Sequence, residues 1–236
     1  MKKWGFVLAV IGIVLLAGVG FAWPRARVPA TRLDVETGFV LIIDAGHGGE
    51  DGGTVSVTGV RESALNLAIA SKTEDLAVFL GIPVQMIRRT DISVYSDGCD
   101  TLSDKKISDL KNRVSAVNGT PGAVLLSIHQ NHFSQEKYRG TQVFYARTPG
   151  SRQLAYAMQS DVRELLDPKN NRSAKPAEKV YLMEHIGCTG VLVECGFLSN
   201  FAEEALLRED SYQKKLAMVL LRSIAEMERT EDGGKV

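Results

Sequence analysis

Residues 39–49 have the sequence Phe-Val-Leu-Ile-Ile-Asp-Ala-Gly-His-Gly-Gly, an unbroken apolar run that ends in a glycine-rich turn. Branched apolar residues without polar alternation are typical of a strand that is buried on both faces of a sheet. The same pattern returns in residues 123–129 and 190–194, which end in a histidine and a glutamate. Because function collects at the carboxyl ends of strands in such sheets, these endings are candidate site positions.

The segments between these runs alternate between helix-like and strand-like patterns. Helices are predicted at 63–80, 104–118, 151–166, 202–208 and 212–229, and strands at 39–43, 82–87, 123–128, 142–146, 180–183 and 190–193. This alternation predicts an α/β fold with an open, mostly parallel or mixed sheet and helices on both faces. We expect a single catalytic domain over residues 39–230, and a disordered tail at 231–236.

The N-terminal segment, residues 1–23, has a different character. Lys2 and Lys3 precede the uncharged run Trp4–Trp23. At about 1.5 Å per residue, a helix of this length spans a hydrocarbon core of about 30 Å. We expect a membrane signal anchor, with a cleaved signal peptide as the alternative, followed by a linker at 24–38. A buried core helix is disfavoured, because a terminal, uninterrupted apolar run is unusual there.

Composition and charge exclude several classes of protein. The chain is 44% hydrophobic and 24% charged, as a globular domain is, with 28 basic and 28 acidic residues. Four of the basic residues and none of the acidic ones precede residue 32, so the remainder has a net charge of −4. That charge argues against a nucleic-acid partner. The three cysteines are odd in number and have no Cys-x-x-Cys spacing, which excludes a full disulfide framework. Cys188 and Cys195 could pair, but small buried hydrophobic side chains are favoured.

Four polar residues form the candidate site: His47, His129, Glu194 and Glu62, the last at the head of a helical pattern. Two histidines and one carboxylate can hold a catalytic zinc ion and leave a position for water. A further glutamate can move protons. Each residue alone also fits a structural explanation, such as a turn, a helix terminus or a core histidine. The functional explanation is strongest for Glu194. A carboxylate that follows an apolar run is buried at an energetic cost and acquires a raised pKa.

The spacing of the two histidines is not that of a helical His-Glu-x-x-His zinc site, so separate segments must assemble this one. Four stretches, in this order along the chain, resemble the zinc-dependent N-acetylmuramoyl-L-alanine amidases, which trim peptidoglycan. The matching stretches are 43–49, 62–67, 127–131 and 193–200. The resemblance extends from about residue 39 to residue 229 and implies an open, mostly parallel sheet flanked by helices.

The resemblance implies that His47, Glu62 and His129 are the zinc ligands and that Glu194 is the catalytic glutamate. The implied substrate is the amide bond between the lactyl group of N-acetylmuramic acid and L-alanine of the stem peptide. Zinc would lower the pKa of its water towards about 7 and polarise the carbonyl. Glu194 would accept the proton of that water and pass one to the departing amine. Such a substrate places the domain outside the cytoplasm, held to the membrane by residues 1–23.

Several nearby polar residues have open roles. Ser127 and Asn131 could orient ligands, or could form ordinary hydrogen bonds at a strand end. His132 stands where the family usually has a small or polar residue, and we expect a histidine on the rim of the site. His185 precedes the Glu194 strand where the family often has an amide, and its role is open.

A single catalytic domain on an anchor, with the stretch Lys-Lys-Ile-Ser-Asp-Leu-Lys-Asn-Arg at 105–113, looks most like the germination-specific amidases of the spore cortex. That resemblance implies removal of the stem peptide as the first step towards muramic-δ-lactam. A partner deacetylase would then complete the formation of the lactam, and some members need a lipoprotein partner. The alternatives are a vegetative cell-separation amidase, a peptidoglycan-binding regulator without activity and a zinc carboxypeptidase-like peptidase.

Overall fold

The computed structural model describes residues 38–232, so the predicted membrane segment and the linker up to residue 37 lie outside the described residues. Within the described range, no helix combines the length and the apolar character needed to cross a membrane.

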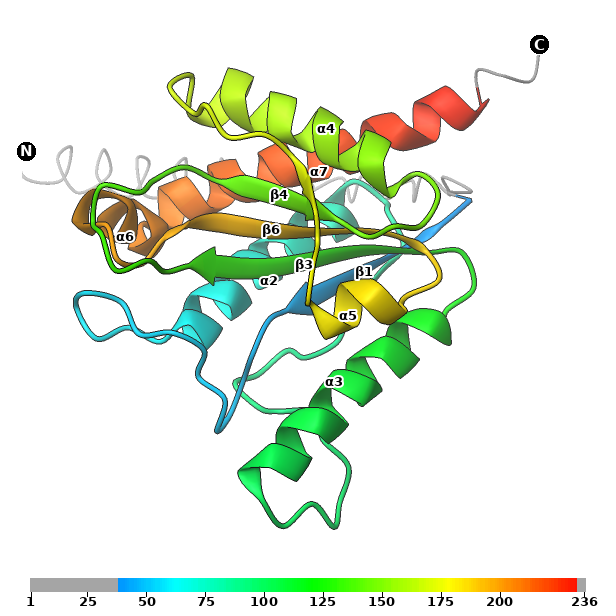
Figure 1. Cartoon of the computed structure of the whole chain (residues 1–236). Helices are drawn as coiled ribbons and strands as arrows, with labels where there is room; N and C mark the ends of the chain where they lie inside the picture. The colour runs from blue at the N-terminus through cyan, green and yellow to red at the C-terminus, as the bar shows by residue number, and fades with distance from the viewer. Residues whose placement is uncertain (1–37, 233–236) are drawn as a thin grey trace, which may run out of the picture. The chain divides into compact units, whose positions relative to one another are not determined.

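A six-stranded mixed sheet forms the centre of the domain, in the order β2-β1-β3-β6-β4-β5 (Figure 1). The strands β2, β1, β3 and β6 are parallel, β4 is antiparallel to β6, and β5 is parallel to β4. The prediction of a mostly parallel, mixed sheet is therefore confirmed. The strands are β1 (Val40–Ala45), β2 (Val84–Met86), β3 (Ala123–Asn131), β4 (Gln142–Tyr145), β5 (Lys175–Pro176) and β6 (Thr189–Phe197).

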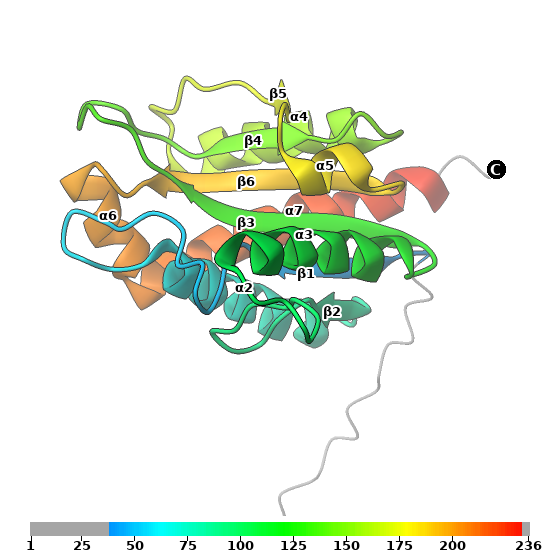
Figure 2. The same cartoon turned by 60° about the horizontal axis from the view of Figure 1, so that its bottom comes forward.

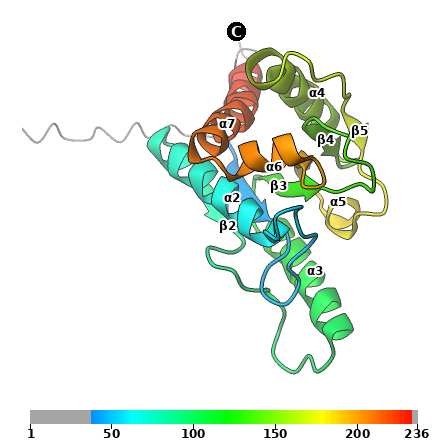
Figure 3. The same ribbon diagram turned by 90° about the vertical axis from the view of Figure 1, so that its left-hand side faces the viewer.

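Helices cover both faces of the sheet, as the alternating pattern predicts. Figure 2 shows α3 and α5 in front of the strands and α7 behind them, and Figure 3 shows α2 and α7 together on the side away from α3 and α5. The helices are α2 (Glu62–Phe79), α3 (Leu102–Asn118), α4 (Ser151–Asp161), a π-helical turn η1 (Val162–Leu166), α5 (Tyr181–His185), α6 (Phe201–Arg208) and α7 (Asp210–Asp232).

The apolar run of β1 contributes to two cores, which explains why it lacks polar alternation. Leu41 and Ile43 are fully buried in the larger cluster, with apolar residues of α2, α4 and α7. Ile42, which points to the other face, belongs to the smaller cluster with Val117 of α3 and Leu182 of α5. A strand buried on both faces needs apolar residues at consecutive positions, and this pattern identified it in the sequence.

Two predicted segments differ from the structure. The segment 180–183, predicted as a strand, instead leads into the helix α5, which begins at Tyr181, and Leu182 and Met183 are buried. The sheet edge beside β4 is taken by residues 175–176, so the later segment has no strand to pair with. The tail predicted to be disordered from residue 231 begins inside α7, which extends to Asp232.

Candidate metal centre and active site

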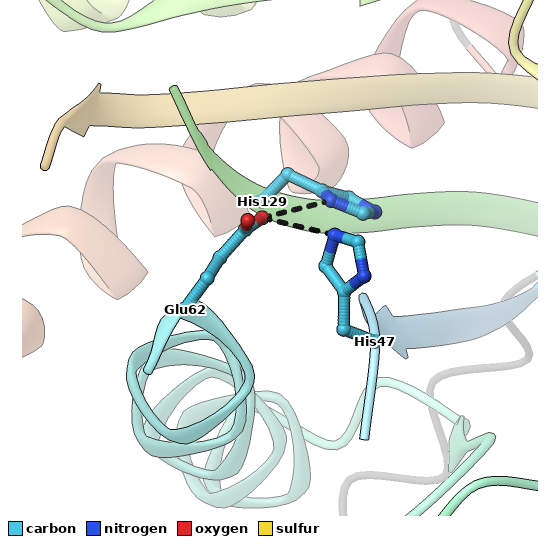
Figure 4. A group of neighbouring side chains, drawn as sticks. All are labelled: His47, Glu62 and His129. Atoms are coloured by element: carbon cyan, nitrogen blue, oxygen red, sulfur yellow. Dashed lines mark hydrogen bonds and ion pairs between the residues drawn. The ribbon is translucent and has the colours of Figure 1, made fainter. Parts of the chain in front are cut away.

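Three of the predicted site residues converge at the carboxyl end of the sheet (Figure 4). His47 follows β1 by two residues, Glu62 is the first residue of α2, and His129 lies in the last part of β3. The Glu62 Oε1 atom is 3.4 Å from His47 Nε2 and 3.1 Å from His129 Nδ1. One ligand atom from each of these residues lies within 4.8 Å of the other two. The structure therefore brings together the three side chains that the sequence singled out as metal ligands.

Glycines let these side chains approach closely. A Cβ atom on Gly46 would lie 2.2 Å from the His129 ring, so no larger residue fits there without displacing that ring. Gly53 has a φ of +66°, and a Cβ atom on it would lie 2.6 Å from the Glu62 carboxylate. The glycine-rich segment thus packs its backbone directly against the ligand side chains, as glycine alone permits.

The carboxylate of Glu62 is held by several donors. Its Oε2 accepts from the backbone N–H of Thr54 (3.0 Å), and its Oε1 accepts from the backbone N–H of Gln130 (3.1 Å). The side-chain amide of Asn66, one helical turn along α2, donates to the same Oε1 at 3.3 Å. Burial opposes ionisation, but hydrogen bonds and charge interactions with the two histidines outweigh it and hold the pKa of Glu62 far below its usual value. Glu62 is therefore an ionised and oriented carboxylate, as a metal ligand must be.

The His47 ring is oriented by a carboxylate on its other side. Its Nδ1 lies 3.1 Å from the Asp51 Oδ2 atom, which leaves Nε2 directed at Glu62. Burial lowers the pKa of His47, but the hydrogen bonds and charges of Asp51 and Glu62 outweigh it and raise this pKa to about 9. On its other side, the Asp51 carboxylate lies 3.5 Å from the Nζ atom of Lys106 in α3. A carboxylate behind a histidine is the usual arrangement at a zinc site, where it fixes the ring and its tautomer.

This donor set suits zinc. Two imidazole nitrogens and one ionised carboxylate oxygen match the ligands of catalytic zinc sites and leave a coordination position for water. The carboxylates of Glu62 and Asp51, which lie 3.4 and 3.1 Å from the ring nitrogens of His47, also place negative charge at this position, which favours a bound cation. The fit thus rests on the identity, the clustering and the charge of the side chains.

Glu194 lies next to this cluster, in β6. It is the register partner of His129 in the pairing of β3 with β6, so both side chains leave the same face of the sheet. The Glu194 Oε2 atom is buried and has no hydrogen-bond partner among the described residues. Burial raises the pKa of Glu194 to about 7, against the opposing charges of the histidines. A carboxyl group with such a pKa can take up and release a proton near neutral pH.

A pocket of about 440 Å³ opens beside Glu194, between β6, β4 and the segment that leads to α5. Phe144 and Leu192 supply its apolar wall, while Lys175 and Glu178 line it with charge. Glu194 is half-buried and lines this pocket, so its carboxyl group is accessible to a substrate from this side of the sheet.

The residues with open roles have distinct positions. Ser127 Oγ donates to Asp44 at 2.6 Å, and Asp44 is ion-paired with Arg113, so Ser127 serves a buried polar network and not a ligand. The backbone carbonyl of Asn131 accepts from the N–H of Leu198 at 2.8 Å. For Ser127 this favours the explanation of hydrogen bonds at a strand end.

The two remaining histidines stand apart from the ligand cluster. His132 is exposed, which agrees with a position on the rim. His185 stacks on Tyr181 at a ring distance of 4.0 Å, and its Nδ1 lies 2.8 Å from the Tyr181 carbonyl oxygen. His185 therefore closes the short helix α5. All three cysteines are free: Cys195 is buried and Cys99 and Cys188 are half-buried.

The sequence arguments missed Asp51, Asn66 and Gln130. Two of them had a local signal: Asn66 is four residues after Glu62 and so shares its helix face, and Gln130 directly follows a predicted ligand. Asp51 lies in the glycine-rich segment four residues after His47, where nothing in the pattern distinguishes it from neighbouring Glu50. The folded conformation of the loop places the carboxylate of Asp51, and not that of Glu50, beside the His47 ring.

Comparison with known proteins agrees with this geometry. Residues 41–226 match the N-acetylmuramoyl-L-alanine amidase family. The germination-specific N-acetylmuramoyl-L-alanine amidase of Bacillus subtilis (strain 168) is 31% identical over an alignment of 228 residues, and the match covers 94% of this chain and 93% of that protein.

Among solved structures, the CwlD amidase from Clostridioides difficile, in complex with the GerS lipoprotein, is similar with a TM-score of 0.77 and 36% identity, over 80% of this chain and 97% of that one. An N-acetylmuramoyl-L-alanine amidase from Clostridium difficile 630 has a TM-score of 0.71 and 27% identity, over 80% and 96% of the two chains. From the family match and these relatives, the chain belongs to the N-acetylmuramoyl-L-alanine amidase family.

Proposed function

We propose that this protein is a zinc-dependent peptidoglycan amidase, which hydrolyses the amide bond between N-acetylmuramic acid and L-alanine of the stem peptide. In this proposal His47, Glu62 and His129 hold the zinc ion and Glu194 is the general acid and base. The observation that carries the proposal is the convergence of the three ligand side chains next to the buried carboxyl group of Glu194, in a chain of the amidase family.

Each residue of the proposed site has a distinct role in the reaction. Zinc, when bound, would lower the pKa of a water molecule and polarise the scissile carbonyl. Glu194, with a buried oxygen that has no partner among the described residues, is placed to accept the proton of the attacking water. The same carboxyl group then donates a proton to the departing amine of L-alanine, because an amide nitrogen leaves poorly unless it is protonated. Glu62 stays ionised throughout, and Asp51 keeps the His47 ring in place.

Digestion of purified peptidoglycan, with and without a chelator, tests the proposal. We expect release of intact stem peptides that begin with L-alanine, and loss of that release when zinc is removed. Mass spectrometry separates the alternatives: shortened stems indicate a carboxypeptidase-like enzyme. No release at full zinc occupancy indicates a peptidoglycan-binding regulator, and either outcome contradicts the proposal.

We further infer a role in the spore cortex, in the first step towards muramic-δ-lactam. The support is the similarity over nearly the whole length to the germination-specific amidase of Bacillus subtilis. A deacetylase would act after this enzyme. An accessory lipoprotein is a candidate partner, since the similar Clostridioides difficile amidase was solved with one. Expression in a sporulating strain without its own germination-specific amidase tests the role: restored muramic-δ-lactam supports it, and restored cell separation alone favours the vegetative alternative.

We also propose that the domain acts outside the cytoplasm, held to the membrane by residues 1–23. The support is the uncharged run Trp4–Trp23 and the location of the proposed substrate. Cell fractionation with N-terminal sequencing tests the anchor. An intact N-terminus in the membrane fraction is expected, and a processed chain in the medium would instead show a cleaved signal peptide.

A further inference from the structure

A second groove, of about 600 Å³, lies next to the pocket of Glu194. It runs beside β4 and the segment that leads from η1 to β5. The chain then passes from β5 in front of β4 and β6 to α5 in Figure 1. Lys175 lines both the groove and the pocket, so the two are contiguous. Gln142, also in the groove, is the register partner of Glu194 in the pairing of β4 with β6. The groove therefore adjoins the pocket that the proposed catalytic carboxyl group lines.

Arg172 is a fixed cation in this groove. Its Nε donates to the Arg139 carbonyl at 2.7 Å, and its Nη1 donates to Gln142 Oε1 at 2.8 Å. The guanidinium also lies over the Phe197 ring, 4.5 Å from the ring centroid. Nη2 has no hydrogen-bond partner among residues 38–232. Because its contacts hold the side chain in one place, little conformational entropy is lost when the free edge binds a ligand.

The positive charge of the groove is not neutralised by the protein. Arg139 is paired with Asp167 at 3.0 Å, but within the described part of the chain no carboxylate lies within 4.0 Å of Arg172, Lys175 or Lys137. Among the carboxylates, Glu203 has the largest charge effect on the pKa of Arg172. Its oxygens, however, accept hydrogen bonds from two backbone N–H groups and form no ion pair with Arg172. A held guanidinium with a free Nη2 group, among further unpaired cations, has the chemistry of a carboxylate site.

We propose that this groove binds a free carboxylate of the stem peptide, with Arg172 as the anchor and Lys175 as a supporting charge. The inference rests on the proposed amidase function. The lactyl carboxyl group is already consumed in the scissile amide and the adjoining sugars are neutral, so the free carboxylates of the substrate lie on its peptide side. The groove thus sets the direction of the substrate, with the peptide leading away from Glu194 along β4 and β5, and makes the enzyme selective for an acidic stem.

A pair of substrates tests this selectivity: a muramoyl peptide with free stem carboxylates, and the same compound with those groups converted to carboxamides. The wild-type enzyme should prefer the acidic compound. Arg172→Gln should lower kcat/KM for the acidic compound by about 10- to 100-fold, mainly through KM, as expected for a lost charge-assisted bond. It should leave the carboxamide compound and the zinc content nearly unchanged. Lys169→Gln, an exposed cation in the same segment but outside the groove, is the matched control.

A second variant and a binding measurement keep the outcome clear. Lys175→Gln, at an exposed position, should reduce the preference in the same direction but less, even if Arg172→Gln does not fold. Equal losses on both compounds, or an unchanged preference in both variants, would overturn the inference. If the wild-type enzyme cleaves neither compound, the proposed function fails. In that case, calorimetric titration with the free stem peptide tests whether the groove binds it, without any need for cleavage. Binding that is unaffected by Arg172→Gln would overturn the inference about the groove.

Discussion

Glu62 and Glu194 stand beside the same pair of histidines, yet their surroundings differ. On the ligand side, formed by β1, α2 and β3, the Glu62 carboxylate accepts hydrogen bonds from Thr54, Gln130 and Asn66. On the proton side, formed by β6 and β4, one carboxyl oxygen of Glu194 is buried with no partner in the described part of the chain. The pKa of Glu62 is therefore lowered, whereas burial raises that of Glu194 to about 7.

This difference teaches how one residue type can take two roles in one site. Donors around a carboxylate stabilise its charged form, as a metal ligand requires. Burial without donors favours the protonated form and brings the pKa into the range in which a group can exchange protons at neutral pH. The same isosteric substitution, glutamate to glutamine, should therefore have different consequences on the two sides, and the following predictions are ordered by the size of the expected effect.

Glu62→Gln should have the largest effect. Loss of a charged ligand should reduce zinc affinity by more than the roughly 100-fold that loss of an orienting partner can cost, and amidase activity should fall to background. Elemental analysis after dialysis, together with a zinc titration, measures this. Glu74→Gln, a glutamate on the same helix α2 that pairs with Arg89, is the control. Unchanged zinc binding in Glu62→Gln would remove Glu62 from the ligand set.

Glu194→Gln, on the proton side, should lower kcat by at least about 10²-fold, which is the usual contribution of general acid–base catalysis. Zinc content should stay at the wild-type level, because Glu194 is not among the three clustered ligand residues. The measurement combines amine release from peptidoglycan with metal analysis of the same sample. Retained activity in this variant would refute the role of Glu194 in proton transfer. Loss of zinc would mean that Glu194, like Glu62, is needed to bind the metal.

Asp51→Asn tests how far the ligand side depends on its supporting residues. The amide keeps the size of the side chain but removes the charge beside His47 Nδ1, and zinc affinity should fall by about 10- to 100-fold. At saturating zinc, kcat should stay close to the wild-type value. Asp91→Asn is the control, because Asp91 accepts from the backbone of Gly49 and does not contact the ring. Equal zinc affinity in the two variants would argue that the His47 ring is fixed without Asp51.

Asn66→Ala should have the smallest effect on chemistry and a measurable one on stability. Asn66 is fully buried, donates to the Gly46 carbonyl at 3.1 Å and accepts from Gln130 at 3.1 Å. Each buried partner left unsatisfied should cost about 1–3 kcal/mol of unfolding free energy, measured by urea denaturation of the zinc-free protein. Asn112→Ala, which removes a partly buried amide near the surface, should cost less. A smaller loss for Asn66 than for Asn112 would mean that this network does not stabilise the ligand side.

Much of the fold was readable from local patterns. The unalternating run of β1 predicted a strand buried on both faces, and the structure confirms it through Ile42 and Ile43, which enter opposite cores. The prediction of a strand at 180–183 was wrong, because a run of four apolar residues is compatible with either a strand or a helix. The outcome depended on which segment occupied the edge of β4, and residues 175–176 occupy it.

The sequence by itself determined the positions of three candidate site residues, His47, His129 and Glu194, because apolar runs set the strands and the residues that end or follow these runs arrive at the same edge of a parallel sheet. Glu62 was found from its place at the head of a helical pattern. The sequence could not determine the environments of these residues. The donors around Glu62, the isolation of Glu194 and the fixed guanidinium of Arg172 all depend on residues distant in the chain. Local periodicity encodes where a strand ends, but a pKa or a binding groove is set by what packs around a side chain, and only the tertiary structure decides that.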